Sequence, residues 1–309
     1  MNDRPLYQKL FFFFTGGWKH EKEPRFSRMA RYRHSQSIFI SSVLDYLKKH
    51  NLDGVNLDWE YPGSRGSPLA DKRRFTGLVR RMMRAFQKDA IDNNKEKRFK
   101  LTLAVSASRK KMEKAYEIKA LSPHVDWVDV MTYNLRGTWR RNTGCPTIMQ
   151  GEIPNVPDSI VAWINGGMPA HKINLGLASY GRSFQLQSPL VYDVGAPTIG
   201  KGPAGIYTKK SAILSHYEIC TIDWMHKTSH EDSSCGTPYA SIDDLWVSYD
   251  DVDSIRYKVS KLVRPLHLNG ISFWALDFDD FSGTNCGGGK YPLLSEAVKI
   301  MNMPRILKV

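Results

Sequence analysis

The sequence predicts an α/β protein built around a parallel sheet. Strand-sized apolar runs alternate with longer amphipathic stretches, an alternation typical of helical crossovers between parallel strands. Apolar residues at helical spacing predict helices at 36–49, 71–87, 157–166, 252–264 and 291–302. The 309 residues suffice for one large domain, or for a domain that carries an insertion.

Six stretches read as strands. They are Lys9–Thr15, Val55–Trp59, Phe99–Ser106, Val125–Tyr133, Lys172–Ala178 and Gly270–Leu276. A closed (β/α)8 barrel needs eight strands, so these six fit either an open doubly wound sheet or a barrel with two strands absent from this chain. The alternation stops between 185 and 250, where short strand-like pieces lie among Gly, Pro, Tyr and Ser. We therefore expect an insertion at 185–250 between 1–184 and 251–309.

Composition narrows the function classes. With 41% hydrophobic and 24% charged residues, the chain is neither disordered nor fibrous. No apolar run approaches the ~20 residues of a membrane span, and the N-terminal apolar run is too short for a secretory leader. The net charge of +13 raises the alternative of a nucleic-acid-binding domain. In the basic stretch 72–84, however, apolar residues recur at helical spacing, which favours an amphipathic helix with a solvated basic face.

Four cysteines stand at positions 145, 220, 235 and 286. They show no CxxC or Cys/His ligand spacing, so we expect no zinc site and no other metal. Whether they form disulfides depends on the compartment in which the protein resides.

The stretch LDGVNLDWEYPG (52–63) places acids within a predicted buried strand. Side chains alternate along a strand, so Asn56, Asp58 and Glu60 share one face, while Leu57 and Trp59 lie on the other, against helices. Glu60 is nearest the carboxyl end, where parallel barrels carry out catalysis. Burial beside other carboxylates should raise the pKa of Glu60 and keep it protonated as an acid catalyst. The competing interpretations are buried structural acids paired with backbone or arginine, and a metal site. The metal site is disfavoured because no histidine or further acid is expected on that face.

DGVNLDWEYP (53–62) resembles the DxxDxDxE signature of family 18 glycoside hydrolases, the chitinases and chitinase-like lectins. Further similar motifs follow in the family's order: TGGW (15–18) for the third barrel strand, PGSRGSP (62–68), MTY (131–133) for the sixth strand, SYGRSF (179–184) for the seventh, and WALD (274–277) for the eighth. The resemblance implies a (β/α)8 TIM barrel that is N-terminally incomplete, lacking its first two strands. It also implies that 185–250 is the family's small α+β insertion.

The resemblance implies hydrolysis of β-1,4-N-acetylglucosamine linkages in chitin by a substrate-assisted retaining mechanism. Glu60 would be the general acid, Asp58 would orient the acetamido nitrogen, Tyr133 would hydrogen-bond the acetamido oxygen, and Asn56 would bond Asp58. The implied substrate-binding residues are Trp18, Trp59, Met131, Asn134, Tyr180, Arg182 and Trp274. No cofactor is implied. We expect an extracellular monomer that acts on chitin or chito-oligosaccharides and has no nucleic-acid or membrane partner. The resemblance also implies a disulfide between Cys220 and Cys286, and leaves Cys145 and Cys235 without an implied partner.

Two positions depart from the family pattern. Asn56 replaces the first Asp of DxDxE, and we expect its amide to bond Asp58 without relaying a proton, which would alter the pH profile. Asn134 replaces the Asp after Met-x-Tyr, removing negative charge beside the developing cation and costing part of the rate. The alternative function is a chitin-binding, lectin-like protein with weak or no catalysis, and the retained Glu60 favours the enzyme.

Overall fold

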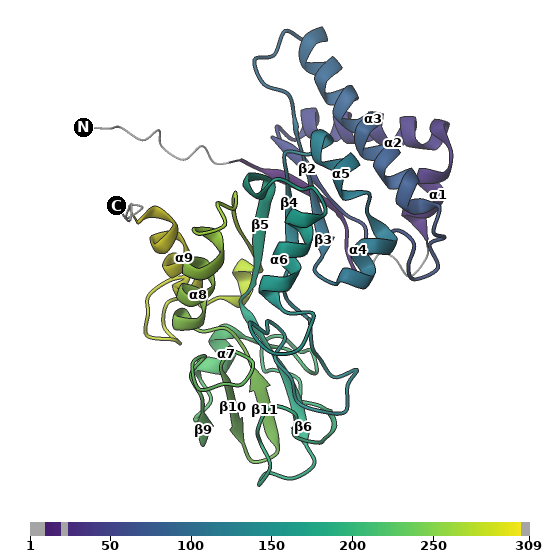
Figure 1. The fold of residues 1–309 in the computed structure, drawn as a ribbon. Coiled ribbons are helices and arrows are strands. Elements are labelled where there is room, and N and C mark those ends of the chain that lie inside the picture. The colour runs from purple at the N-terminus through teal and green to yellow at the C-terminus, as the bar shows by residue number, and fades with distance from the viewer. Residues whose placement is uncertain (1–9, 20–23, 304–309) are drawn as a thin grey trace, which may run out of the picture. The chain divides into compact units, whose positions relative to one another are not determined.

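The computed structural model describes residues 10–19 and 24–303 and divides into two compact units (Figure 1). The first unit contains the chain up to Asp129 together with Trp163–Lys172, and the second contains Val130–Ala162 and the chain from Ile173 onward. Lys9, where the first predicted strand begins, lies outside the described residues, as does most of the N-terminal stretch weighed as a leader.

The first unit is built on a sheet with the strand order β1-β2-β3-β4. These strands are β1 (Phe12–Gly16), β2 (Gly54–Asp58), β3 (Lys100–Ser106) and β4 (Trp127–Met131), and β4 leads into the second unit. β2 pairs in parallel with both β1 and β3, and its Asn56 stands opposite Phe14 and Thr102. The predicted parallel pairing is confirmed for these three strands.

Helices cover the apolar side of this sheet. They are α1 (Arg25–Arg31), α2 (Arg33–Lys49), α3 (Asp71–Asp92), α4 (Arg109–Ala115), α5 (Ile118–Leu121) and the 3-10 turns η2 (Ser122–His124) and η3 (Ala170–Lys172). Helix α3 buries Phe75, Met82 and Phe86, whereas Arg80 and Arg84 are exposed. The predicted amphipathic helix with its basic face in solvent is therefore confirmed.

The second unit contains the remaining two predicted strands, β5 (Ile173–Ala178) and β12 (Gly270–Trp274), which pair in parallel. Its other helical elements are α7 (His216–Cys220), α8 (Val252–Lys258), the π-helical turn η4 (Val259–Val263), the 3-10 turn η5 (Leu276–Phe278) and α9 (Pro292–Asn302). Helix α6 (Val156–Asn165) contains the point where the chain passes back to the first unit. Among the described residues, no helix is both long and apolar enough to cross a membrane.

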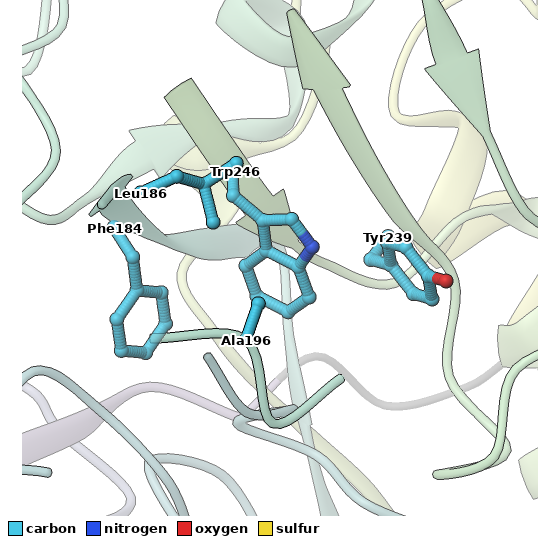
Figure 2. Packing of buried hydrophobic residues seen from close by; sticks show 5 residues of the cluster. All are labelled: Phe184, Leu186, Ala196, Tyr239 and Trp246. Carbon is cyan, nitrogen blue, oxygen red and sulfur yellow. The ribbon is translucent and has the colours of Figure 1, made fainter. Parts of the chain in front are cut away.

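An antiparallel sheet with the order β7-β6-β11-β10-β9 also belongs to the second unit, and β8 pairs with β6. The strands are β6 (Tyr180–Leu186), β7 (Thr198–Lys201), β8 (Leu214–Ser215), β9 (His226–Lys227), β10 (Tyr239–Ile242) and β11 (Leu245–Ser248). Phe184, Leu186, Ala196, Tyr239 and Trp246 form a core cluster of this sheet (Figure 2). The predicted boundaries of the insertion, 185 and 250, stay a prediction.

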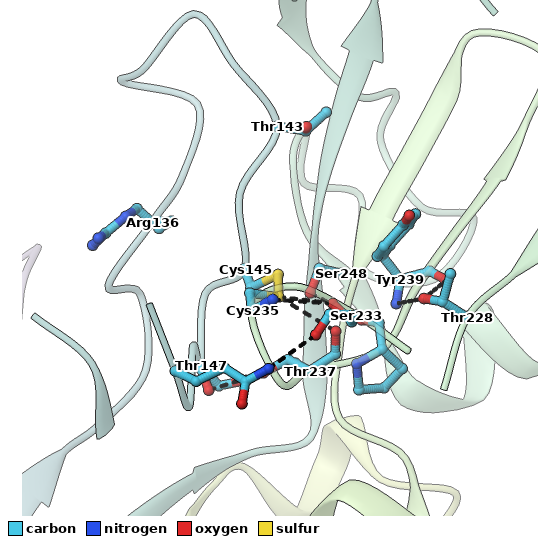
Figure 3. Close-up of a disulfide and its surroundings, with 12 residues drawn as sticks. Arg136, Thr143, Cys145, Thr147, Thr228, Ser233, Cys235, Thr237, Tyr239 and Ser248 are labelled. Atoms are coloured by element: carbon cyan, nitrogen blue, oxygen red, sulfur yellow. Dashed lines mark hydrogen bonds between the residues drawn. A yellow bond between two sulfur atoms is a disulfide. The ribbon is translucent and has the colours of Figure 1, made fainter. Parts of the chain in front are cut away.

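Two disulfides lie within the second unit. The expected bond between Cys220 and Cys286 is confirmed. Cys145 and Cys235, for which the sequence offered no partner, bond to each other (Figure 3). Around this second disulfide, the backbone N–H of Met149 donates to the carbonyl of Cys235 at 2.8 Å. All four cysteines are therefore paired.

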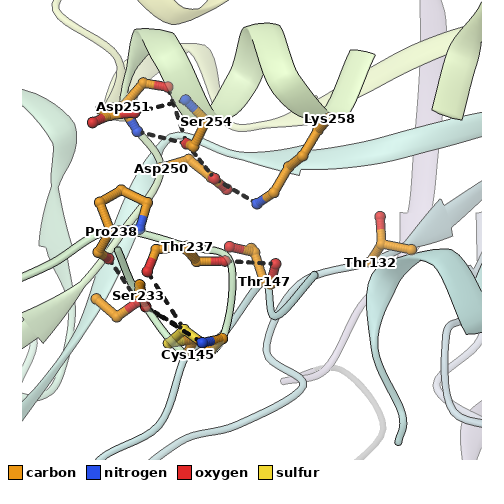
Figure 4. Close-up of polar contacts among 12 residues, drawn as sticks. Thr132, Cys145, Thr147, Ser233, Thr237, Pro238, Asp250, Asp251, Ser254 and Lys258 are labelled. Carbon is orange, nitrogen blue, oxygen red and sulfur yellow. Dashed lines mark hydrogen bonds and ion pairs between the residues drawn. A yellow bond between two sulfur atoms is a disulfide. The ribbon is translucent and has the colours of Figure 1, made fainter. Parts of the chain in front are cut away.

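A buried ion pair anchors helix α8 (Figure 4). Nζ of Lys258 donates to Oδ1 of Asp250, and Oγ of Ser254 donates to the same oxygen at 2.7 Å. Asp251 caps the helix by accepting from the backbone N–H of Ser254 at 2.8 Å. Burial lowers the pKa of Lys258, and the adjacent Asp250 carboxylate opposes that effect. A buried charge of this kind is tolerated because it is paired and hydrogen-bonded.

Candidate active site

The first unit carries the polar face of β2. Val55 and Leu57 are fully buried on the opposite face, and Asn56 is 1% exposed. Nδ2 of Asn56 donates to Oγ1 of Thr102 at 2.9 Å and to Oδ2 of Asp129 at 2.8 Å. The NH2 group of Asn56 is thus taken by Thr102 and Asp129, so a bond between Asn56 and Asp58 could involve only the amide oxygen and stays a prediction. The expectation that no further acid reaches this face is wrong.

Asp129 is a site residue that the sequence analysis missed. It lies on β4 and was hidden within the strand motif VDVMTY, 73 residues after Asn56. An acid at an inward position of a predicted strand was the available signal. Its partner could not be read from the sequence, because side-chain neighbours across a sheet depend on register and strand order.

Asp58 and Glu60 are both disposed to hold protons. Burial, and secondly the charge of Glu60, raise the pKa of Asp58 to about 8. Burial also raises the pKa of Glu60, so the predicted direction is confirmed, although burial rather than carboxylate neighbours is its largest cause. Near neutral pH the pair therefore carries a proton on Asp58. The peptide bond that follows Glu60 is cis.

Several groups near Glu60 favour its ionised form and limit the rise in its pKa. In decreasing order they are a hydrogen bond from Tyr61, the charges of Lys111 and Arg65, and a hydrogen bond from the backbone of Trp18. Nζ of Lys111 lies 4.5 Å from the ring centroid of Tyr61, and burial lowers the pKa of Lys111. The candidate acid thus lies in a partly buried setting with two nearby cations.

Trp18 is 54% exposed, as a sugar-stacking residue requires. The guanidinium carbon of Arg65 lies 3.6 Å from the centroid of its ring, and Nη1 of Arg65 donates to the carbonyl oxygen of Trp18 at 2.9 Å. Arg65 thus lies over the indole, and Nζ of Lys111 lies 5.8 Å from the centroid of the same ring.

Trp59 lies in the helical core of the first unit rather than at a ligand surface. It is 1% exposed and packs against Phe26 and Phe75, with ring centroids 5.4 Å and 5.6 Å away. This burial corrects the expected substrate contact of Trp59, and it follows from the alternation that places Trp59 opposite Asp58.

The second unit holds the remaining predicted residues. The rings of Tyr133 and Tyr180 are 6.4 Å apart, and Tyr180 in turn contacts Phe278 at 5.8 Å. A Cβ on Gly176 would lie 2.3 Å from the carbonyl oxygen of Val130 and 3.1 Å from Cε1 of Tyr133. Gly176 is thus a second missed residue, because only glycine allows the Tyr133 segment to approach β5 so closely.

Asn134 holds Arg182, because Oδ1 of Asn134 accepts from Nε of Arg182 at 2.8 Å. Asn134 has a left-handed backbone (φ 55°), a conformation that asparagine adopts more readily than most residues. Trp274 is 52% exposed at the end of β12, whereas Tyr180 is buried and Met131 is half-buried. Trp274 is therefore the predicted residue of this unit with the most surface open to a ligand.

Within the described part of the chain, His216, Cys220 and Cys286 bring metal-ligating atoms within 4.8 Å of one another. Both sulfurs belong to a disulfide, so neither is a thiolate that could bind zinc.

Residues 7–279 match the Glycosyl hydrolases family 18. The chain belongs to this family. It is 37% identical to Chitotriosidase-1 of Mus musculus over 98% of its own length and 68% of that protein. The family's fold agrees with the structure, so the predicted (β/α)8 barrel class is confirmed, with six of its strands among the described residues.

Two solved structures illustrate the range within family 18. Catalytic domain 2 of the Ostrinia furnacalis Group II chitinase superposes with a TM-score of 0.87 at 34% identity, covering 94% of this chain and 77% of that one. Human YKL-39, described as a pseudo-chitinase with retained chitooligosaccharide binding, superposes equally well (0.87, 32% identity, 94% and 80% covered). The family and fold therefore leave open whether a member hydrolyses or only binds.

Proposed function

We propose that this protein is a chitinase that cleaves β-1,4-N-acetylglucosamine linkages with Glu60 as the general acid. The observation that carries the proposal is the pair of half-buried Asp58 and buried Glu60 at the end of β2, both of which have a raised pKa. A general acid must be protonated near the working pH and must lie beside the bond that breaks. Burial moves Glu60 toward the first condition, because it raises the pKa of this carboxyl group.

In the proposed mechanism, Glu60 protonates the glycosidic oxygen while the substrate's own N-acetyl carbonyl attacks the anomeric carbon. No enzyme carboxylate is needed as the nucleophile, since this family is an exception to the two-carboxylate scheme. Asp58 would hold the acetamido nitrogen and stabilise the positive charge that develops on it.

Family roles are proposed for the residues of the second unit as well. Tyr133 would hydrogen-bond the acetamido oxygen, and Trp274 would lie beneath the reacting sugar, consistent with its exposed ring. Arg182 would position the sugar chain, and its bond to Asn134 supports a fixed orientation. The two disulfides support an extracellular location, where such bonds persist.

The second candidate function is binding of chito-oligosaccharides without hydrolysis. It is favoured by Asn134, which removes a carboxylate that the family signature places after Met-x-Tyr, and by the likeness to the pseudo-chitinase YKL-39. In this structure the side-chain oxygen of Asn134 accepts a hydrogen bond from Arg182. A neutral amide at this position stabilises a developing cation less than a carboxylate does.

Turnover of a fluorogenic chitobioside distinguishes these functions. We expect the parent protein to release the fluorophore, and Glu60→Gln to lower the rate about 10²–10⁴-fold by removing the transferable proton. Glu113→Gln is the matched control, since Glu113 is exposed on α4 and should leave the rate unchanged. Equal rates in the parent and Glu60→Gln would refute the enzyme. Retention on chitin with no turnover would establish the binding protein instead.

A further inference from the structure

The amide of Asn56 is held in one orientation. Its Nδ2 donates to a carboxylate oxygen of Asp129 and to the hydroxyl of Thr102, at 2.8 Å and 2.9 Å. In this orientation the NH2 group of Asn56, and not its oxygen, points toward the carboxyl group of Asp129, which accepts the hydrogen bond. Because the NH2 group faces Asp129 and Thr102, the amide oxygen is directed away from them. Asn56 is almost fully buried, so this oxygen is also kept from water.

That oxygen lacks a donor. Oδ1 of Asn56 is buried and has no hydrogen-bond partner among the described residues, and the same holds for Oδ1 of Asp58. A buried acceptor without a donor is costly, so such a pair of unsatisfied atoms calls for an explanation. The two residues are neighbours on one face of β2, separated by about 6.6 Å along the strand. A protonated Asp58 could serve as the donor that the oxygen of Asn56 lacks.

We propose that Asp129 is a positioning residue that acts through Asn56: it fixes the amide so that Oδ1 of Asn56 accepts a hydrogen bond from the protonated carboxyl group of Asp58. Asp129 would thereby supply, from β4, the carboxyl group that the family signature places at position 56 itself. The carboxyl group therefore stands on β4, at Asp129, and the amide stands on β2, at Asn56, where the family signature has the acid. The inference rests on the proposed function, because its catalytic consequence requires Asp58 to serve a reaction.

Five other titratable or charged residues lie near Asp58 and Asn56. Glu60 and Tyr61 follow β2, Arg65 lies in the next loop, and Lys111 and Tyr116 come from α4 and its end. Arg65 and Lys111 act on Glu60, while Tyr61 and Tyr116 carry no charge near neutral pH because burial raises the pKa of each. Substitutions at positions 56 and 129 leave these residues unchanged, so a shift in the Asp58 titration can be attributed to the substitutions.

A charge swap tests the proposal. The variants are Asp129→Asn, Asn56→Asp, and the double variant that carries both changes and so keeps one carboxylate and one amide. We expect Asp129→Asn to lower kcat about tenfold with KM within about twofold, because positioning matters most in the transition state. Asn56→Asp sets two carboxylates within hydrogen-bond distance, so one must take up a proton and the pH profile should change. The double variant should recover kcat to within about threefold of the parent.

A measurement on the free protein separates this inference from the proposed function. Carboxyl ¹³C NMR follows the titration of Asp58, assigned with Asp58→Asn. Asp129→Asn should lower the Asp58 pKa, since it removes the group that fixes the acceptor for the Asp58 proton, and the swap should raise it again. Asp92→Asn, an exposed change on α3, is the control and should leave the titration unchanged.

The outcomes are distinct. A parent that never cleaves chitobioside refutes the proposed function, while the titration of Asp58 still tests its link to Asp129. An unchanged Asp58 titration in Asp129→Asn overturns the inference, as does a double variant no better than the poorer single one. Should Asp129→Asn fail to fold, the double variant and Asn56→Asp carry the test, because each keeps a carboxylate in the pair.

Discussion

Asp58 in the first unit is half-buried and Asp280 in the second is buried, yet their carboxyl groups behave in opposite ways. Burial raises the pKa of Asp58 to about 8, and its Oδ1 has no hydrogen-bond partner among the described residues. Burial opposes ionisation of Asp280 too, but hydrogen bonds from Ser282 and from the backbone N–H groups of Cys286 and Asn285 outweigh it and lower its pKa.

The contrast shows that burial alone does not decide the state of an acid in this protein. Donors placed around the carboxylate decide it. Asp280 accepts at 2.8–2.9 Å from three backbone N–H groups of the loop that ends at Cys286, so its charge orders that loop. Asp58 is left short of donors, which keeps it ready to exchange a proton. A satisfied acid contributes structure, and an unsatisfied one is a candidate for chemistry.

The largest effect is expected at the satisfied acid. Asp280→Asn should lower the free energy of unfolding by about 3 kcal/mol at pH 7, because charge-assisted bonds are lost and an NH2 group is turned toward backbone donors. Urea unfolding measures the change. Asp277→Asn, an exposed acid three residues earlier, is the control.

The pH dependence of Asp280→Asn provides a second check. The lowered pKa of Asp280 gives a stabilisation that is present above its unfolded pKa and is lost as the pH falls through the folded value. The difference between parent and variant should therefore shrink in acid. A variant as stable as the parent at pH 7 would contradict the structural role assigned to this acid.

A smaller effect of opposite sign is expected at the unsatisfied acid. Because the folded pKa of Asp58 is raised from 3.8 to about 8, the folded state binds a proton that the unfolded state has lost, and the parent loses stability as the pH rises between these values. Asn cannot titrate. Asp58→Asn should gain about 1–2 kcal/mol relative to the parent between pH 5 and pH 8, after allowance for partial exposure.

Urea unfolding of Asp58→Asn at pH 5, 6.5 and 8 measures this trend, with Asp92→Asn as the control. A variant that lost stability relative to the parent as the pH rose would contradict the contrast between the two acids. That result would mean that Asp58 is ionised and hydrogen-bonded like Asp280.

The smallest effect concerns the cations near Glu60. The charge of Lys111 favours ionisation of Glu60, so Lys111→Met should raise the pKa of Glu60. If Glu60 is the general acid, the alkaline limb of kcat/KM should move to higher pH by less than about one unit. The adjacent Lys110→Met is the control, since Lys110 is exposed. A limb that stayed in place or moved to lower pH would show that Lys111 does not tune the acid.

Much of the fold could be predicted because the signals are local. Alternation along β2 correctly placed Val55 and Leu57 in the core, and helical periodicity found α3 with its basic outer face. The same alternation argued for a buried Trp59, and the substrate contact expected for it from the family resemblance does not fit the structure. The predicted Cys220–Cys286 bond rested on that resemblance, not on any local pattern.

The sequence by itself determined that Asn56, Asp58 and Glu60 share one face of a buried strand, because side-chain direction in a strand depends only on position along it. It also carried the family motifs. The tertiary structure alone decided that Asp129 meets Asn56 and that Cys145 pairs with Cys235. Only the structure, too, shows that Asp58 rather than Asp280 holds a proton near neutral pH. These outcomes depend on strand order, register and the donors that folding brings around each carboxylate, and residues far apart in the chain supply them.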